Sequence, residues 1–157
     1  MPVDVTTQTV INRPVGEVAS FVADPSNATK WYVNIKEATW KTNPPLVVGS
    51  RVAFAAEFMG KRLEYTYEFT EVVPRERVVM RTAEGPFPME TVYAWEAAGE
   101  GATRMMLRNH GSPKGFSRIM APFMSFAMRR ANRKDLARLK ELLEGGSAAG
   151  ASHSKAA

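Results

Sequence analysis

Apolar and polar residues alternate along most of the first 112 residues, which is the pattern of strands that bury one face. The first alternating segment contains Val3, Val5, Thr7, Thr9 and Ile11. Further alternating segments, separated by short turn sequences, cover residues 52–58, 63–69, 78–82, 89–95 and 103–109, and Trp40 belongs to one more strand. Hairpin-length spacing between them predicts an antiparallel meander of about seven strands in all.

Two short helices are expected directly after the first strand. Pro14 suits a first helical turn, and apolar residues recur at helical spacing in the segment "PVGEVASFVAD" that follows it. Asp24-Pro25 is typical of a second helix start, because the Asp side chain accepts a free backbone N–H and Pro takes the first helical position. This second helix is predicted to carry Trp31 and Tyr32 inward.

From residue 113 to residue 144 the apolar residues follow a 3.6-residue period, which predicts one long helix. Pro122 is expected to bend this helix or to mark a broken first segment. Gly145-Gly146 is expected to end it, and the small and polar residues 145–157 are expected to form a disordered tail. The sequence therefore predicts an α+β fold with one domain over residues 1–144.

Composition removes several kinds of chemistry. The chain of 157 residues has no cysteine, which excludes disulfides, Cys-based zinc sites, iron–sulfur clusters and a Cys nucleophile. Its start lacks a signal-peptide pattern, and no apolar run reaches membrane-spanning length, so a cytoplasmic location is expected. Neither a cofactor nor a metal site is expected, because no His, Asp and Glu residues cluster with ligand spacing.

Positive charge is concentrated near the C-terminus. Residues 113–144 hold eight basic and three acidic residues, a surplus equal to the formal net charge of +5 of the whole chain. Within them, the segment 119–134 has an apolar first part and four basic residues at its end. The favoured interpretation is a buried helix with a solvated continuation, and transient contact with a membrane is the second. Nucleic acid is not expected as a partner, because exposed aromatic residues are not interleaved with the cations.

The sequence contains, in this order, "INRPVGEVASFVADPSNATKW", Gly49 before a strand, "FTEVVPRERVVMR" and "GEGATRMML". These segments resemble the START/Bet v 1-like (SRPBCC) superfamily, and within it the bacterial polyketide cyclase/dehydrase and lipid-transport group. Their order and spacing extend over residues 3–144. The resemblance implies a helix-grip fold, in which a curved antiparallel sheet wraps around the long C-terminal helix and leaves a cavity. It does not imply one function, because the superfamily includes carriers, receptors, aromatase/cyclases and co-chaperone domains.

The inward faces of these elements would line such a cavity. The candidate ligand-binding residues are Trp31, Phe54, Phe58, Tyr65, Tyr67, Phe69, Met80, Phe87, Met89, Tyr93, Trp95, Met105, Leu107, Phe116, Met120, Phe123, Met124 and Ala127. For most of them, filling an ordinary core is the simpler interpretation. Three phenols in one apolar space (Tyr65, Tyr67, Tyr93) need hydrogen-bond partners, which water or a ligand would provide.

Catalytic candidates are few. Of the two histidines, only His110 lies outside the predicted tail. Alternation along its strand places Asn109 inward and His110 outward. We therefore expect a non-enzymatic protein that binds or carries a small hydrophobic or aromatic molecule, which includes lipids. The first alternative is a polyketide cyclase or dehydratase in which the three tyrosines and Arg108 orient the substrate. The second is a co-chaperone-like protein-binding module, and the oligomeric state is left open.

The cavity entrance is predicted at one end of the sheet. There Trp31, Phe87, Phe116 and Met120 are expected to converge, with Trp31 either opening as a gate or sealing the core permanently. Permanent sealing is favoured, because large aromatic residues at the ends of elements usually close a core. Truncation of Trp31 would separate the two alternatives.

Overall fold

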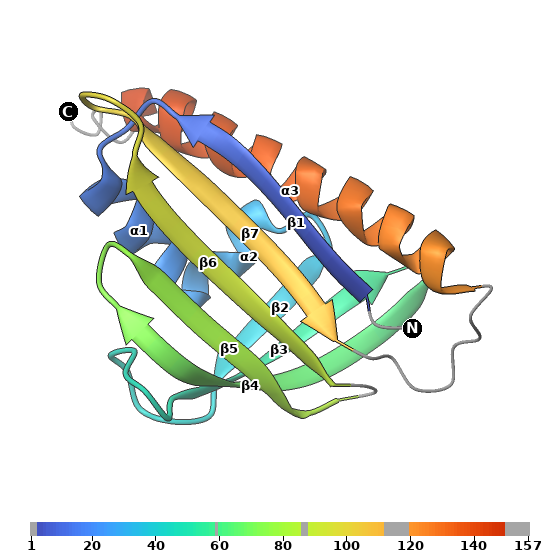
Figure 1. Cartoon of the computed structure of the whole chain (residues 1–157). Coiled ribbons are helices and arrows are strands. Elements are labelled where there is room, and N and C mark those ends of the chain that lie inside the picture. The colour runs from blue at the N-terminus through green and yellow to red at the C-terminus, as the bar shows by residue number, and fades with distance from the viewer. Residues whose placement is uncertain (1–2, 59, 86–87, 112–119, 150–157) are drawn as a thin grey trace.

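Seven antiparallel strands form one curved sheet, and a long helix lies along it (Figure 1). The structure is a computed structural model that describes residues 3–58, 60–85, 88–111 and 120–149. Its elements are β1 (Val3–Ile11), α1 (Val15–Ala23), the 3₁₀ helix η1 (Pro25–Asn27), α2 (Ala28–Trp31), β2 (Ile35–Trp40), β3 (Arg51–Phe58), β4 (Lys61–Val73), β5 (Arg77–Glu84), β6 (Met89–Ala97), β7 (Thr103–Gly111) and α3 (Met120–Ala149). This is the predicted α+β helix-grip fold.

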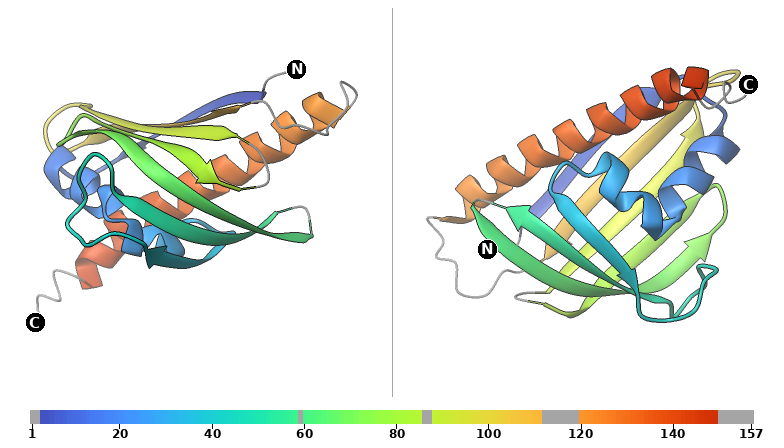
Figure 2. Two further views of the ribbon diagram at one scale, coloured as in Figure 1. Left: turned by 90° about the horizontal axis from the view of Figure 1, so that it is seen from below. Right: turned by 180° about the vertical axis from the view of Figure 1, so that it is seen from behind.

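The strand order is β1-β7-β6-β5-β4-β3-β2, so every neighbour except β1 and β7 is also a neighbour in sequence. β1 closes one edge by pairing with β7 along its full length, from Val3 opposite Gly111 to Ile11 opposite Thr103. This pairing brings the beginning of the chain beside α3, which packs against β1 (Figure 1). The sheet therefore presents one face to the helices and the other outward (Figure 2).

The short helices begin where the sequence predicts. Pro14 caps α1, and the Asp24 side chain accepts a hydrogen bond of 2.9 Å from the Ser26 backbone N–H at the start of η1. The expected second helix is a 3₁₀ turn followed by α2, which ends at the buried Trp31. Figure 2 shows these elements on the same side of the sheet as α3.

The end of the long helix differs from the prediction. α3 continues through Gly145 to Ala149 instead of ending at the glycine pair. A glycine inside a helix costs about 1 kcal/mol relative to alanine but keeps its backbone N–H, so it weakens a helix without breaking it. The predicted helical segment before Met120 and the tail after Ala149 lie outside the described residues.

The main core lies between the inner sheet face and the helices. Buried side chains from α1, α2, the central strands and the second half of α3 meet there. The largest of those that are almost fully enclosed include Trp31, Ile11, Met105, Leu107 and Leu139. The first half of α3 and the inner face of the sheet leave a space between them. This space is the candidate site.

Candidate functional site

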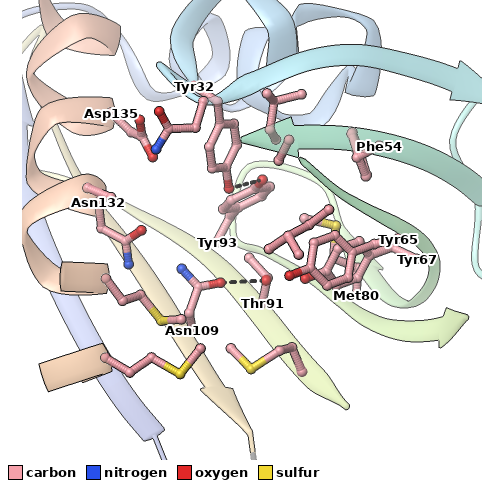
Figure 3. Close-up of a pocket in the computed structure, with 18 residues that line it drawn as sticks. Tyr32, Phe54, Tyr65, Tyr67, Met80, Thr91, Tyr93, Asn109, Asn132 and Asp135 are labelled. Atoms are coloured by element: carbon pink, nitrogen blue, oxygen red, sulfur yellow. Dashed lines mark hydrogen bonds between the residues drawn. The ribbon is translucent and has the colours of Figure 1, made fainter. Parts of the chain in front are cut away.

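A cavity of about 140 Å³ lies between the inner face of the sheet, the end of α2 and the first half of α3. Its lining residues are Tyr32, Asn34, Ile35, Phe54, Ala56, Leu63, Tyr65, Tyr67, Met80, Met89, Thr91, Tyr93, Asn109, Met124, Met128, Ala131, Asn132 and Asp135. The strand residues among them follow the two-residue period of β3 to β7, and the helix residues recur every three or four positions of α3. Alternation and helical period thus build one space from seven elements and the α2–β2 connection (Figure 3).

Two phenols define the end of the cavity nearest α2. The Tyr32 and Tyr93 hydroxyl oxygens lie 2.7 Å apart and form a hydrogen bond. The Trp31 ring packs on both of their rings, with centroid distances of 4.1 Å to Tyr32 and 5.8 Å to Tyr93. Because only one of the two hydroxyl protons is used in this bond, the second stays free to donate to a bound molecule.

A second polar pair lies deeper along the sheet. The Thr91 hydroxyl donates to the Asn109 side-chain oxygen at 2.6 Å, across the β6–β7 pair. The rings of Tyr65 and Tyr67 stand beside it, 5.9 Å apart (Figure 3). Burial raises the pKa of all four cavity phenols, Tyr32, Tyr65, Tyr67 and Tyr93, so they remain protonated at neutral pH.

Asp135 is the one acidic residue that lines the cavity. Its side chain is 3% exposed, and one carboxyl oxygen accepts a hydrogen bond of 2.8 Å from the Val33 backbone N–H. Burial raises the pKa of Asp135 to about 7, against the opposing effects of the Val33 hydrogen bond and the positive charge of Arg138. Both protonation states of this carboxyl are therefore populated near neutral pH.

Asn132 lines the cavity from α3 and is also buried. Its side chain is 4% exposed, and its nitrogen Nδ2 has no hydrogen-bond partner among the described residues. The cavity-facing part of α3 thus combines methionine and alanine with two buried polar side chains, Asn132 and Asp135.

The structure places the predicted ligand-binding residues in different environments. Seven line the cavity: Phe54, Tyr65, Tyr67, Met80, Met89, Tyr93 and Met124. Five are buried in the core outside the lining: Trp31, Phe69, Trp95, Met105 and Leu107. Phe87 and Phe116 lie outside the described residues, and the side chains of Phe58 and Met120 are not described either.

Two predicted lining residues of α3 lie elsewhere. Phe123 is 53% exposed, because it precedes the buried Met124 by one residue and so points about 100° away around the helix. Ala127 is half-buried and does not contact the cavity. The helical period was correct, but the width of the buried stripe was overestimated.

The predicted entrance is wrong in its placement of Trp31. The Arg138 guanidinium donates to the Lys30 carbonyl oxygen at 2.8 Å, so α2 lies against the second half of α3. Met120 begins α3 fifteen residues before Asp135, a distance of about 22 Å along the helix. Trp31 therefore does not converge with Met120, and at 1% exposed it closes the core.

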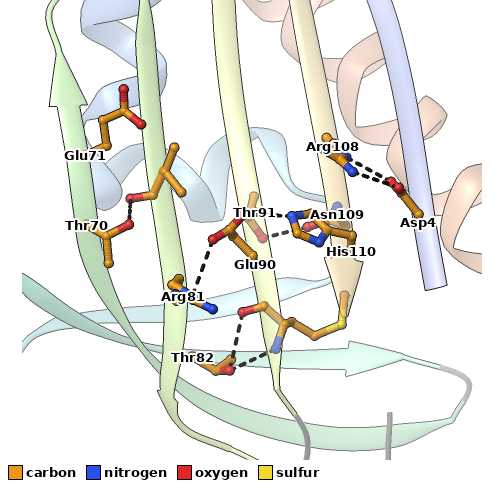
Figure 4. Close-up of polar contacts among 12 residues, drawn as sticks. Asp4, Thr70, Glu71, Arg81, Thr82, Glu90, Thr91, Arg108, Asn109 and His110 are labelled. Carbon is orange, nitrogen blue, oxygen red and sulfur yellow. Dashed lines mark hydrogen bonds and ion pairs between the residues drawn. The ribbon is translucent and has the colours of Figure 1, made fainter. Parts of the chain in front are cut away.

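The outer face of the sheet carries the remaining candidate residues. His110 points outward as alternation predicts, and its Nε2 lies 2.7 Å from Glu90, which also pairs with Arg81 at 3.3 Å (Figure 4). Arg108, considered above for substrate orientation, also points outward and pairs with Asp4 at 2.7 Å. Arg108 therefore cannot orient a molecule inside the cavity.

Four lining residues were not predicted from the sequence as site residues: Tyr32, Thr91, Asn132 and Asp135. A signal was present for Asp135, because Met124, Met128, Ala131 and Asp135 share the spacing of one helix face. A charged residue in such an apolar series is a candidate for function. Among the described residues, no group of three His, Asp or Glu side chains is placed to hold a metal ion, and no helix is long and apolar enough to cross a membrane.

Comparison with known proteins gives one family. The sequence model described as "Polyketide cyclase / dehydrase and lipid transport" matches residues 2–144. No curated protein matches the chain.

Solved structures share the fold at low sequence identity. TTHA0849 from Thermus thermophilus is 19% identical with a TM-score of 0.79, covering 92% of this chain and 99% of that chain. The Zhui aromatase/cyclase from Streptomyces sp. R1128 is 12% identical with a TM-score of 0.78, covering 92% and 94%. The ginseng major latex-like protein 151 from Panax ginseng is 13% identical with a TM-score of 0.70, covering 88% and 95%. At these identities the likeness establishes the fold alone.

Proposed function

Because the chain belongs to the polyketide cyclase/dehydrase and lipid transport family of the SRPBCC superfamily, we propose that it binds a small hydrophobic or aromatic molecule in the cavity under α3. Members of this superfamily typically bind hydrophobic ligands or act as aromatase/cyclases. The observation that supports binding here is a cavity with methionine and aromatic walls and a few polar groups, which is the usual composition of a ligand pocket.

The size of the cavity limits the ligand. A dry apolar cavity of about 150 Å³ holds one benzene-sized molecule, and the cavity here measures about 140 Å³. The ligand, or the part of it that is enclosed, is therefore about one aromatic ring in size. Methionines on both walls (Met80, Met89, Met124, Met128) adapt to different apolar shapes, which suits a binding site more than a unique catalytic geometry.

The test uses ring-sized probes and a matched pair of alanines on α3. Ala131 lines the cavity, whereas Ala137 is exposed on the opposite side of the same helix. Toluene and p-cresol are expected to bind the wild-type protein and the Ala137→Phe variant. The Ala131→Phe variant is expected to bind both probes far more weakly or not at all. Ala131→Leu serves as the milder variant if phenylalanine prevents folding.

Binding would be measured by ligand-observed NMR, together with native mass spectrometry of protein purified from its own host. Failure of both probes to bind the wild-type protein, with no co-purified small molecule, would overturn the proposal. Equal binding to Ala131→Phe and to Ala137→Phe would place the ligand outside this cavity.

Asp135 favours a second candidate function, cyclase- or dehydratase-like catalysis. A carboxyl with a pKa of about 7 is suited to accept and return a proton at neutral pH. The free hydroxyl proton of the Tyr32–Tyr93 pair would stabilise an enolate oxygen formed at the same end of the cavity. Turnover of a ring-sized β-hydroxy ketone that is unchanged in Asp135→Asn would remove this candidate.

A further inference from the structure

The exposed side of α3 differs from the rest of the molecular surface. Phe123 and Phe126 are 53% and 64% exposed, two of the five large hydrophobic residues that are exposed in the described part of the chain. Arg130, Arg133 and Lys134 follow them and are exposed as well. Spacings of three and four residues place all five side chains on one stripe, which we call the α3 outer face.

The cations of the α3 outer face have no partners in the described part of the chain. Each arginine that lies in a strand pairs with a carboxylate within 4 Å: Arg51, Arg62, Arg77, Arg81, Arg104 and Arg108. Arg130, Arg133 and Lys134 have no hydrogen bond or ion pair within the described ranges. No acidic residue occurs between positions 119 and 134 that could neutralise them.

The α3 outer face is exposed because the opposite side of the helix makes the contacts with the sheet. Met124, Asn132, Asp135 and Leu139 turn toward the sheet and are buried. Figures 1 and 2 show no described helix or strand on the outward side of α3. The two phenyl rings therefore remain in contact with water, at an unfavourable free energy that a partner surface would relieve.

We propose that the α3 outer face docks on an anionic lipid membrane. Phenyl groups enter the boundary between headgroups and acyl chains, while neighbouring arginine and lysine side chains bind anionic headgroups. A nucleic acid duplex, whose bases are already stacked, would contact the cations alone and leave the phenyl pair exposed on the helix. Met124 and Met128 form one wall of the cavity, and docking would bring this wall close to the lipid. An apolar ligand could then leave the membrane near the cavity.

Vesicle sedimentation tests this with the full chain. Vesicles of phosphatidylcholine alone are compared with vesicles that contain about one third phosphatidylglycerol, at low and at high salt. Binding is expected only to the anionic vesicles and is expected to fall with salt. Arg130→Gln/Arg133→Gln/Lys134→Gln should weaken it by roughly fivefold for each cation removed, and Phe123→Ser/Phe126→Ser by roughly tenfold or more.

Matched controls separate the α3 outer face from overall charge and hydrophobicity. Lys36→Gln/Lys41→Gln/Lys61→Gln removes the same charge from exposed positions elsewhere, and Val47→Ser/Val48→Ser removes two exposed apolar side chains. Both controls should keep vesicle binding. Circular dichroism would confirm that each variant is folded, which is expected because all substituted residues are exposed.

Three results would overturn the proposal. They are absence of binding to anionic vesicles, equal loss in the control variants, and tighter binding to a single-stranded oligonucleotide than to vesicles. The test is independent of the ligand experiment, because the variants leave the cavity lining unchanged.

Discussion

Asp135 is a buried carboxyl whose pKa lies near neutral pH. It sits on the buried side of α3, where the Val33 N–H is its one hydrogen-bond donor among the described residues. Burial favours the protonated form of a carboxyl, and this effect outweighs the Val33 hydrogen bond and the positive charge of Arg138, so the pKa of Asp135 rises to about 7. The folded state therefore holds a proton that the unfolded state releases at much lower pH.

Stability should consequently fall as pH rises. Between the ordinary pKa of 3.8 and about 7, the folded protein binds one more proton at Asp135 than the unfolded chain, so the free energy of unfolding decreases with pH over that range. The total decrease is at most about 4 kcal/mol. Asp135→Asn keeps an acceptor for Val33 and should remove this decrease, as measured by urea unfolding at several pH values.

Asp4 provides a control of opposite sign. Its pKa is lowered because Arg108 donates hydrogen bonds to it, so its contribution is present above pH 3.8 and lost as pH falls. Asp4→Asn should therefore leave the decrease between pH 4 and pH 7 in place. A wild-type curve without any decrease over that range would show that Asp135 ionises normally.

Trp31 is expected to seal the core and not to open as a gate. Its side chain is 1% exposed and contacts both phenols of the hydrogen-bonded pair. Trp31→Ala should lower the free energy of unfolding by about 3–5 kcal/mol, the usual loss for a large buried aromatic side chain. A loss far below this range, accompanied by faster exchange of a bound probe in NMR, would instead identify a gate. Trp40→Ala is the control, because Trp40 is half-buried on β2 and away from the cavity.

At the scale of elements, the sequence predicted which helices and strands exist and in which order they follow. It did not predict how the helices are placed against each other. Alternation identified the strands, and Asp24-Pro25 marked the second helix, because both signals are local. The contact of α2 with the second half of α3 depends on Arg138 reaching Lys30, 108 residues away in sequence, and no periodic pattern records it. For the same reason, the wall residues Phe54 and Met80 were predictable from alternation, whereas the pairing of Tyr32 with Tyr93 was not.

The end of β7 offers a test of how tightly the elements meet. A Cβ atom added at Gly111 would overlap the Pro88 carbonyl oxygen and lie 3.0 Å from the Met89 Cα. Backbone atoms cannot move aside without breaking the β6–β7 pairing, so Gly111→Ala should lower the free energy of unfolding clearly. Gly145→Ala meets nothing within 4 Å inside α3 and should raise it by up to about 1 kcal/mol. Thermal unfolding would measure the stability of both variants. A Gly111→Ala protein that is more stable than the Gly145→Ala protein would contradict this account.

For the molecule as a whole, an unfilled cavity is a thermodynamic disadvantage. At about 24 cal/mol per Å³ for a closed core cavity, a space of 140 Å³ corresponds to at most roughly 3 kcal/mol of stability that better packing would provide. Such a space is expected where function requires it, since stability and activity often oppose each other at binding sites. Filling the cavity should therefore separate the two properties.

Two alanines on β3 make this separation measurable. Ala56 lines the cavity, and Ala53, three residues earlier, faces the outer side of the sheet opposite Thr66. Ala56→Ile should raise the free energy of unfolding by about 1 kcal/mol, because it buries further methyl groups in existing space, and it should also weaken p-cresol binding. Ala53→Ile should leave binding unchanged. If Ala56→Ile destabilised the protein without affecting binding, the space would be too small or too rigid to accept a side chain, and the ligand would have to enter elsewhere.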